Sequence, residues 1–207
     1  VLTDLREGFL PSRFEKAQQL DINTIQIGLR NLKGLKWLEL SWNAEVPRIV
    51  QISPPAKIGS KSTLAKQIHF GLQEMALIEL RQNGFERIVE LSFAKRPGGE
   101  VQKSIILELM GRHSNLLLLD NQRNVITLGR QIRNHQSRVR PISTGDPYFL
   151  PPSLKGIKPS RQETYSRWKQ RLCLTPTTLK KALQETYQGV SPSLSIQLAD
   201  EEKETAK

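Results

Sequence analysis

The chain is poor in the residues that build disulfide and metal frameworks, with one cysteine in 207 residues. Cys173 therefore has no partner for an internal disulfide bond, and a cysteine-based metal cage is excluded. The three histidines, His69, His113 and His135, form none of the close spacings typical of metal sites. The sequence predicts no metal and no cofactor.

Long apolar runs are also missing. No segment approaches the roughly 20 apolar residues that a membrane-spanning helix needs. The first residues, Val1–Asp4, lack the charged, apolar and small-residue order of a signal peptide. We therefore expect a soluble, cytoplasmic protein with no membrane partner.

Catalytic motifs are absent as well: no nucleophile elbow, phosphate-binding loop or dinucleotide fingerprint is found. Acid–base chemistry would have to come from Glu86 and Arg87, at the entrance of a predicted strand, together with His113. Adjacent Glu and Arg residues are more often a solvated pair. The prediction is a protein that is not an enzyme.

Positive charge is abundant and unevenly placed. There are 31 Lys and Arg residues against 20 Asp and Glu, a net charge of +11. Residues 155–181 contain eight cations and one acid, and residues 121–145 contain no acid and five arginines: Arg123, Arg130, Arg133, Arg138 and Arg140. This distribution favours nucleic acid before an anionic membrane surface, and a solvated basic surface without a ligand remains an alternative.

Alternating apolar and polar residues predict an α+β fold. A helix is expected at 2–10, a second at 63–74, and strands of a first antiparallel sheet at 14–18, 24–30, 35–42 and 48–52. Further strands at 76–80, 87–93, 104–109, 116–119 and 125–128 predict a second sheet. We expect two antiparallel sheets packed as a sandwich with flanking helices.

Five prolines in residues 141–160 mark a boundary between domains, after which the apolar residues follow helical spacing. Thr175 and Pro176 are typical of an N-cap and a first helical residue, and the turn 187–192 leads into a helix at 192–199. The predicted organisation is an α+β domain at 1–152, a linker at 153–160, a helical segment at 161–199 and a polar tail at 200–207.

A polar segment, Met110–Asn115, separates two apolar runs and is expected at the rim of the sheet. It offers a cation, an imidazole, a hydroxyl and an amide from Arg112, His113, Ser114 and Asn115. Two interpretations remain open: a binding site, or a bulge whose polar side chains satisfy local backbone groups.

The strings MGRHSNLLLLD at 110–120 and VRPISTGDPYFLPP at 139–152 resemble the N-terminal domain of the NFACT family. Segments 10–17, 28–30 and 84–89 follow in the family's order, so the resemblance covers nearly the whole chain. It implies a fold similar to the N-terminal domain of formamidopyrimidine-type DNA glycosylases. It also implies that the helical segment is a helix-hairpin-helix module.

The resemblance implies an RNA-binding module of a ribosome quality-control factor, whose partners are tRNA and the large ribosomal subunit with stalled peptidyl-tRNA. The family's later coiled-coil segment has no counterpart here. One alternative is an adhesin-like module for fibronectin, after an older family name, which no residue favours. Another is a DNA-processing enzyme related to the glycosylases, although these react through an N-terminal proline and this chain begins with Val1.

At the position of Glu86–Arg87 the family usually has Asp-Arg, a pair implicated in tRNA engagement. We expect Gly111, Tyr148 and Pro152 to be structural. The predicted nucleic-acid contacts are Glu86, Arg87, Arg112, His113, Ser114, Asn115, Arg140, Gly189, Val190 and Ser191.

Overall fold

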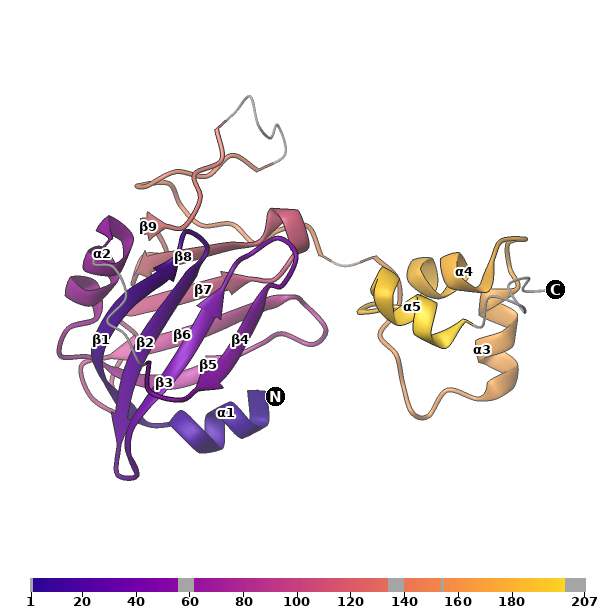
Figure 1. Ribbon diagram of the computed structural model, residues 1–207. Helices are drawn as coiled ribbons and strands as arrows, with labels where there is room; N and C mark the ends of the chain where they lie inside the picture. Colours follow the sequence, from indigo (N-terminus) through magenta and orange to yellow (C-terminus); the bar gives the residue numbers. More distant parts are fainter. Residues whose placement is uncertain (1, 56–61, 134–139, 154, 200–207) are drawn as a thin grey trace. The chain divides into compact units, whose positions relative to one another are not determined.

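The computed structural model describes residues 2–55, 62–133, 140–153 and 155–199. They form two compact units (Figure 1). The first contains the chain up to Asn83 and Arg87–Pro151, and the second contains Gly84–Glu86 and the chain from Pro152 onward. The predicted polar tail at 200–207 lies outside the described residues, as do His135 and Arg138.

The first unit is built on antiparallel strands with two helices. The helices are α1 (Leu2–Phe9) and α2 (Thr63–Leu72). The strands are β1 (Ser12–Asp21), β2 (Thr24–Asn31), β3 (Gly34–Ser41), β4 (Arg48–Ile52), β5 (Ala76–Arg81), β6 (Ile88–Ala94), β7 (Lys103–Glu108), β8 (Asn115–Asp120) and β9 (Val125–Leu128). The α+β class predicted from the sequence is confirmed.

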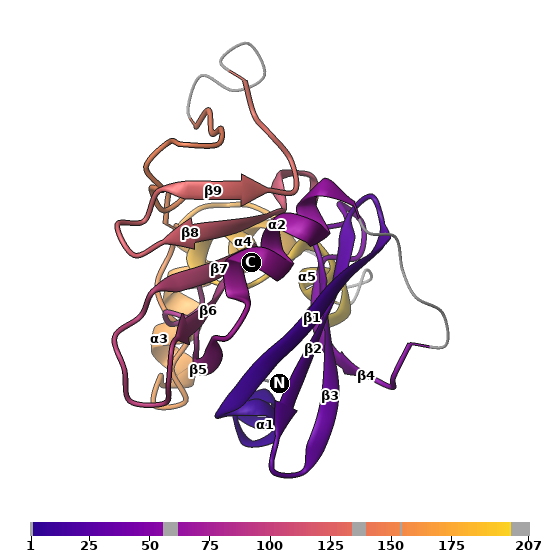
Figure 2. The same ribbon diagram turned by 90° about the vertical axis from the view of Figure 1, so that its left-hand side faces the viewer.

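The prediction of two separate sheets is wrong. Within the described residues the strands form one sheet in the order β4-β3-β2-β1-β5-β6-β7-β8-β9. β1 joins β5 through two residue pairs, Ser12 with Leu77 and Arg13 with Ala76, and we call this junction the crease. Figure 2 shows β1–β3 and β7–β9 as two layers that meet at an angle. The two predicted sheets are therefore halves of one bent sheet.

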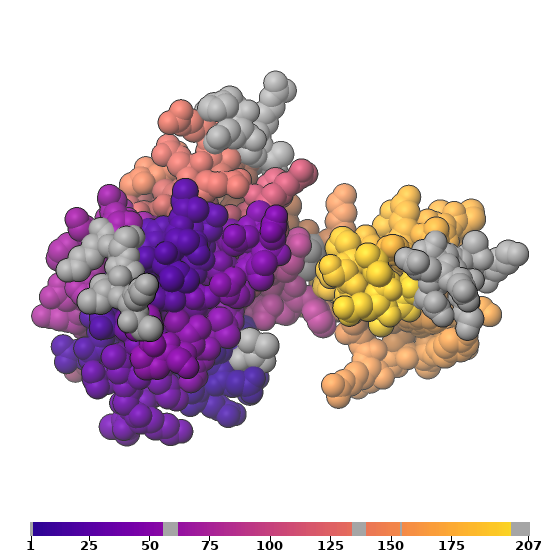
Figure 3. All heavy atoms as spheres, viewed as in Figure 1, coloured from indigo at the N-terminus to yellow at the C-terminus, as the bar shows by residue number. Residues whose placement is uncertain are grey.

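One core lies between the two halves. It contains Ile27 and Leu38 from the β1–β4 half and Leu107 and Leu118 from the β6–β9 half, all without solvent exposure. Alternation along each strand sends these side chains inward, while the opposite face of the β1–β4 half forms an outer surface of the unit (Figure 3).

Both helices of the first unit add to this core. Leu5 and Phe9 of α1 and Ile68 and Leu72 of α2 are buried in it. Helix α2 begins after Ser62, whose hydroxyl accepts a hydrogen bond from the backbone N–H of Ala65, an N-cap that fixes where the helix starts.

The second unit contains α3 (Tyr165–Leu172), α4 (Leu179–Thr186) and α5 (Pro192–Leu198) around a small core of Leu172, Ala182, Leu183 and Tyr187. Among the helices of both units, none is long and apolar enough to cross a bilayer, within the residues described.

The predicted start of the second helix of this unit, with Thr175 as N-cap and Pro176 as first residue, is wrong. Helix α4 begins at Leu179, and the hydroxyl of Thr178 accepts from the backbone N–H of Lys181. Ala182 and Leu183 of this helix are buried in the small core, and the capping hydrogen bond of Thr178 marks where the helix starts. The helix at Pro192 is confirmed, with Ser191 as its N-cap.

The core predicts the effect of truncating Leu107, which has no solvent exposure. Leu107→Ala should lower the free energy of unfolding by about 2–5 kcal/mol, because it removes contacts and leaves a cavity. Leu32→Ala, at an exposed leucine, is the matched control and should have little effect. Urea denaturation measures both, and equal losses would contradict the burial of Leu107 in the core between the two halves.

Candidate nucleic-acid interface

One end of the β6–β9 half brings together Arg87, Arg112 and His113 of the predicted site with a further arginine, Arg130. Ile88, Glu108 and Asn115 lie side by side in register on β6, β7 and β8, and the backbone N–H of Leu109 donates to the carbonyl of Arg87 at 2.8 Å. Neighbouring strands are about 4.8 Å apart, so the residues that flank this row share one edge. We call Arg87, Arg112, His113 and Arg130 the arginine rim; all four are exposed.

A single 3₁₀ turn, Gly111–His113, carries Arg112 and His113 between β7 and β8. Gly111 has φ +56°, which a residue without a side chain adopts at little cost. The backbone N–H of Ser114 donates to the carbonyl of Gly111 at 2.9 Å and closes the turn. The side chains of Arg112 and His113 therefore start from a fixed backbone.

Ser114 and Asn115 point inward, with 2% and 1% of their surface exposed. The Ser114 hydroxyl accepts from the N–H of Met110 at 2.8 Å. The Asn115 amide oxygen accepts from the N–H groups of Leu116 and Arg130, and its amide nitrogen donates to the carbonyl of Arg130 at 2.8 Å. Ser114 and Asn115 therefore satisfy local backbone groups, as the interpretation of this segment as a structural bulge expects. The side chains of Arg112 and His113 are exposed.

Arg130 was not among the residues predicted to contact nucleic acid, although it belongs to the basic stretch noted in the sequence. The Asn115 side chain binds the backbone N–H and the backbone carbonyl of Arg130. The guanidinium of Arg130 donates to the carbonyl of Arg112 at 2.9 Å. Besides that stretch, the sequence signal for this position is a Gly-Arg pair directly after the strand that ends at Leu128.

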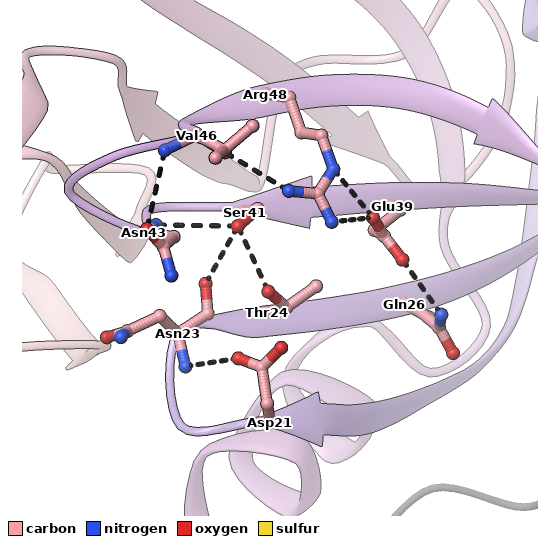
Figure 4. A network of polar contacts seen from close by, with 9 residues as sticks. All are labelled: Asp21, Asn23, Thr24, Gln26, Glu39, Ser41, Asn43, Val46 and Arg48. Atoms are coloured by element: carbon pink, nitrogen blue, oxygen red, sulfur yellow. Dashed lines mark hydrogen bonds and ion pairs between the residues drawn. The ribbon is translucent and has the colours of Figure 1, made fainter.

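The loop 42–47, between β3 and β4, lies beside the turn of the rim, since a Cβ added at Gly111 would be 3.7 Å from the carbonyl oxygen of Ala44. A polar network holds this loop (Figure 4). Arg48 donates to Glu39 at 2.9 and 2.7 Å and to the carbonyl of Val46 at 3.1 Å. The side chain of Asn43 accepts from the N–H of Glu45 at 2.9 Å. Gln26 donates to the second oxygen of Glu39 at 3.0 Å, which fixes this buried carboxylate.

Trp42 of this loop packs against Gly129, directly before Arg130. A Cβ at position 129 would lie 2.5 Å from the indole ring, so a larger residue does not fit. The indole N–H is buried and has no hydrogen-bond acceptor among the described residues. This close contact sets the position of the Arg130 backbone against the opposite half of the sheet.

Beneath the rim lies a buried ion pair. Arg140 donates two hydrogen bonds to Glu108, at 2.9 and 2.6 Å, and two to the carbonyl of Phe149, at 3.1 and 2.8 Å. The Tyr148 hydroxyl donates to Glu108 at 2.9 Å. Burial raises the pKa of Tyr148 far above its ordinary value, and the neighbouring Glu108 carboxylate raises this pKa further. The phenol therefore keeps its proton and acts as a hydrogen-bond donor.

Arg140 therefore attaches the segment before Pro151 to β7. Its pairing with Glu108 offsets its charge, and the phosphate contact predicted from the sequence stays a prediction. Tyr148 is structural, as expected. Within the described ranges, no three His, Cys, Asp or Glu side chains gather as a metal ion would require.

The remaining predicted contacts belong to the second unit. Gly189 lies against Phe85, where an added Cβ would be 3.1 Å from the ring, and Val190 packs on the small helical core. The Ser191 hydroxyl accepts from the N–H of Leu194 at 3.1 Å. Glu86 is partly exposed in this unit, whereas its sequence neighbour Arg87 belongs to the first.

The fold and the motif at Gly111 define the class of protein. A family model described as NFACT N-terminal and middle domains matches residues 1–207, so the chain belongs to the NFACT family. Rqc2 homolog RqcH of Streptococcus suis is 28% identical over 206 residues, which cover 97% of this chain and 37% of that protein. Rqc2 homolog RqcH of Bacillus subtilis is 30% identical over 132 residues, covering 62% and 22%. The chain thus spans little more than a third of these relatives at most.

Solved structures support the fold. The N-terminal domain of fibronectin-binding protein PavA from Streptococcus pneumoniae has a TM-score of 0.77 at 23% identity, covering 96% of this chain and 78% of that one. The N-terminal part of the fibronectin/fibrinogen-binding protein from Streptococcus suis has a TM-score of 0.76 at 24% identity, covering 93% and 73%.

The geometry of the rim separates residues that hold it from residues that act at it. Asn115→Ala should lower the free energy of unfolding by about 1–3 kcal/mol, because it leaves two backbone N–H groups without acceptors. Arg112→Ala should leave it unchanged within about 0.5 kcal/mol, since the side chain is exposed. Denaturant unfolding measures both; a large loss from Arg112→Ala would make that residue structural.

Proposed function

We propose that this chain is the RNA-binding module of a cytoplasmic ribosome quality-control factor, which engages tRNA and the large ribosomal subunit carrying stalled peptidyl-tRNA. The observation that supports this most is the arginine rim, in which three guanidinium groups project from fixed backbone in a member of the NFACT family. The relatives named Rqc2 homolog RqcH and the net charge of +11 agree with it.

The chemistry of the rim suits an RNA backbone. Guanidinium groups present several N–H donors in a plane and bind phosphate oxygens in pairs. The Arg112 Nε donates to the His113 Nε2 at 3.3 Å, so these two side chains lie next to each other on the turn. The proposed direct contacts are Arg87, Arg112, His113 and, added from the structure, Arg130.

The role proposed is to bind and position tRNA, while the ribosome performs peptidyl transfer. From the family resemblance we extend the proposal to the second unit, as a helix-hairpin-helix module whose Gly189–Ser191 turn gives backbone contacts to phosphate. Ser114, Asn115 and Arg140 act indirectly, by holding the segments that carry the rim.

Removal of single rim arginines tests the proposal. Arg87→Ala and Arg112→Ala should each weaken tRNA binding by about tenfold or more, because a charge-assisted hydrogen bond contributes about 1.5–3 kcal/mol. Fluorescence anisotropy with labelled tRNA measures the affinity. Lys33→Ala removes an exposed cation from the turn between β2 and β3, away from the rim, and is the matched control. Unchanged affinity in both arginine variants would exclude the rim as the tRNA site.

Salt dependence is a second test. If the rim neutralises three or four phosphates, the logarithm of the association constant should fall linearly with the logarithm of salt concentration, with a slope of about −2 to −4. Each rim arginine replaced by alanine should reduce that slope by about one. An affinity that does not change between low and physiological salt would contradict a phosphate-based interface.

Association with the ribosome needs the complete protein. Co-sedimentation of the full-length protein with large subunits, followed by sequencing of the bound RNA, should show tRNA in the bound fraction. The double variant Arg87→Ala, Arg112→Ala should lose that tRNA. Sedimentation apart from the large subunit would contradict the proposed partner.

A further inference from the structure

A second basic site lies at the other ends of the strands, at the crease. A cavity of about 690 Å³ opens where β1 and β5 begin and β2 and β6 end. Its lining includes four cations, Arg13, Arg30, Lys95 and Arg96. The arginine rim is at the opposite end of β6, which begins at Ile88.

Small side chains at the crease keep this space open. Arg30, Arg13, Ala76 and Ala94 are paired in one row across β2, β1, β5 and β6. Residues directly opposite each other in antiparallel strands project from the same face, with Cβ atoms about 5 Å apart. The two guanidinium groups therefore rise beside the methyl group of Ala76, which lines the cavity and is too short to cover them.

The cations of this cavity have spare donor capacity. Arg30 is paired with Glu15 at 2.9 Å and is still about half exposed, at 53% of its side chain. The side chains of Arg13, Lys95 and Arg96 make no hydrogen bond or ion pair with the residues that the structure describes, and all three are exposed. Glu74 is the one acid among the described lining residues.

The rest of the lining combines the polar residues Ser12, Asn31 and Glu74 with apolar side chains. Pro11, Met75 and Pro97 line the cavity beside the cations. Its volume falls in the range of about 300–1,000 Å³ that holds small organic ligands, and it exceeds what a bare phosphate ion would fill. A ligand that fits therefore combines an anionic group with an organic body.

We propose that the crease cavity binds a phosphate ester of the size of a nucleoside monophosphate. A phosphomonoester carries a charge of about −1.5 to −2 and three oxygens that accept hydrogen bonds, which matches several guanidinium groups around one space. Its organic part lies against the proline and methionine walls. The ester is either a free nucleotide or the 5′-phosphorylated end of an RNA strand, because both present the same group.

This site is independent of the arginine rim, so the two proposals fail separately. Isothermal titration with AMP tests the first source. A 5′-phosphorylated RNA tetranucleotide and the same strand with a 5′-hydroxyl test the second. We expect AMP to bind, or the phosphorylated strand to bind at least tenfold tighter than its 5′-hydroxyl counterpart.

Substitutions locate the binding. Arg13→Ala should weaken it by about tenfold to a hundredfold, in line with the loss of a charge-assisted hydrogen bond. Arg13→Lys should retain part of it, and Lys33→Ala, at a cation outside the lining, should have no effect. An unchanged unfolding midpoint of Arg13→Ala shows that this variant is folded. If Arg13→Ala does not fold, the double variant Lys95→Ala, Arg96→Ala takes its place in the binding test.

The outcomes are distinct. If AMP binds and competes with the phosphorylated strand, the cavity binds the phosphate ester of a free nucleotide or of both ligands at one shared site. If only the phosphorylated strand binds, the ligand is the end of an RNA strand. Absence of AMP binding at millimolar concentration, together with no preference for the 5′-phosphate, overturns the proposal. Equal affinity in the wild type and in the variants of Arg13 or of Lys95 and Arg96 overturns it as well.

Discussion

The short pairing between β1 and β5 is the constraint on which the rest of the first unit depends. Two residue pairs, Ser12 with Leu77 and Arg13 with Ala76, join two sets of strands into one sheet. Because so few pairs tie the halves, the sheet can bend there and place both apolar faces against each other. The shared core, the contact between Trp42 and Gly129 and the crease cavity all follow from this bend.

Polar residues serve the interface in two ways, according to their burial. Ser114, Asn115 and Glu108 are buried and bind backbone groups or a charged partner, so they determine where the rim segments lie. Arg112 and His113 are exposed and contribute little to folding. A buried carboxylate such as Glu108 is tolerated because Arg140 and Tyr148 both donate to it.

This division suits a protein that positions a polyanion. A phosphate backbone requires donors at set positions, and long side chains achieve that only from a rigid base. The 3₁₀ turn at Gly111–His113, closed by Ser114, supplies such a base for Arg112, and Asn115 does the same for Arg130. The arginine rim and the crease cavity lie at opposite ends of the strands of this unit.

The sequence by itself determined the secondary structure and the motif. Alternation over Thr24–Asn31 and the apolar run before Glu108 are local patterns, so the strands and the polar turn between β7 and β8 were predicted close to their observed bounds. Tertiary structure alone decided the number of sheets, since Ser12 and Leu77 are distant in sequence and leave no local signal of their pairing. It also decided which polar side chains of the motif face inward, because the partner of Asn115 is the backbone of Arg130. The cap of α4 is Thr178 and not Thr175, because the hydroxyl of Thr178 meets the backbone N–H of Lys181.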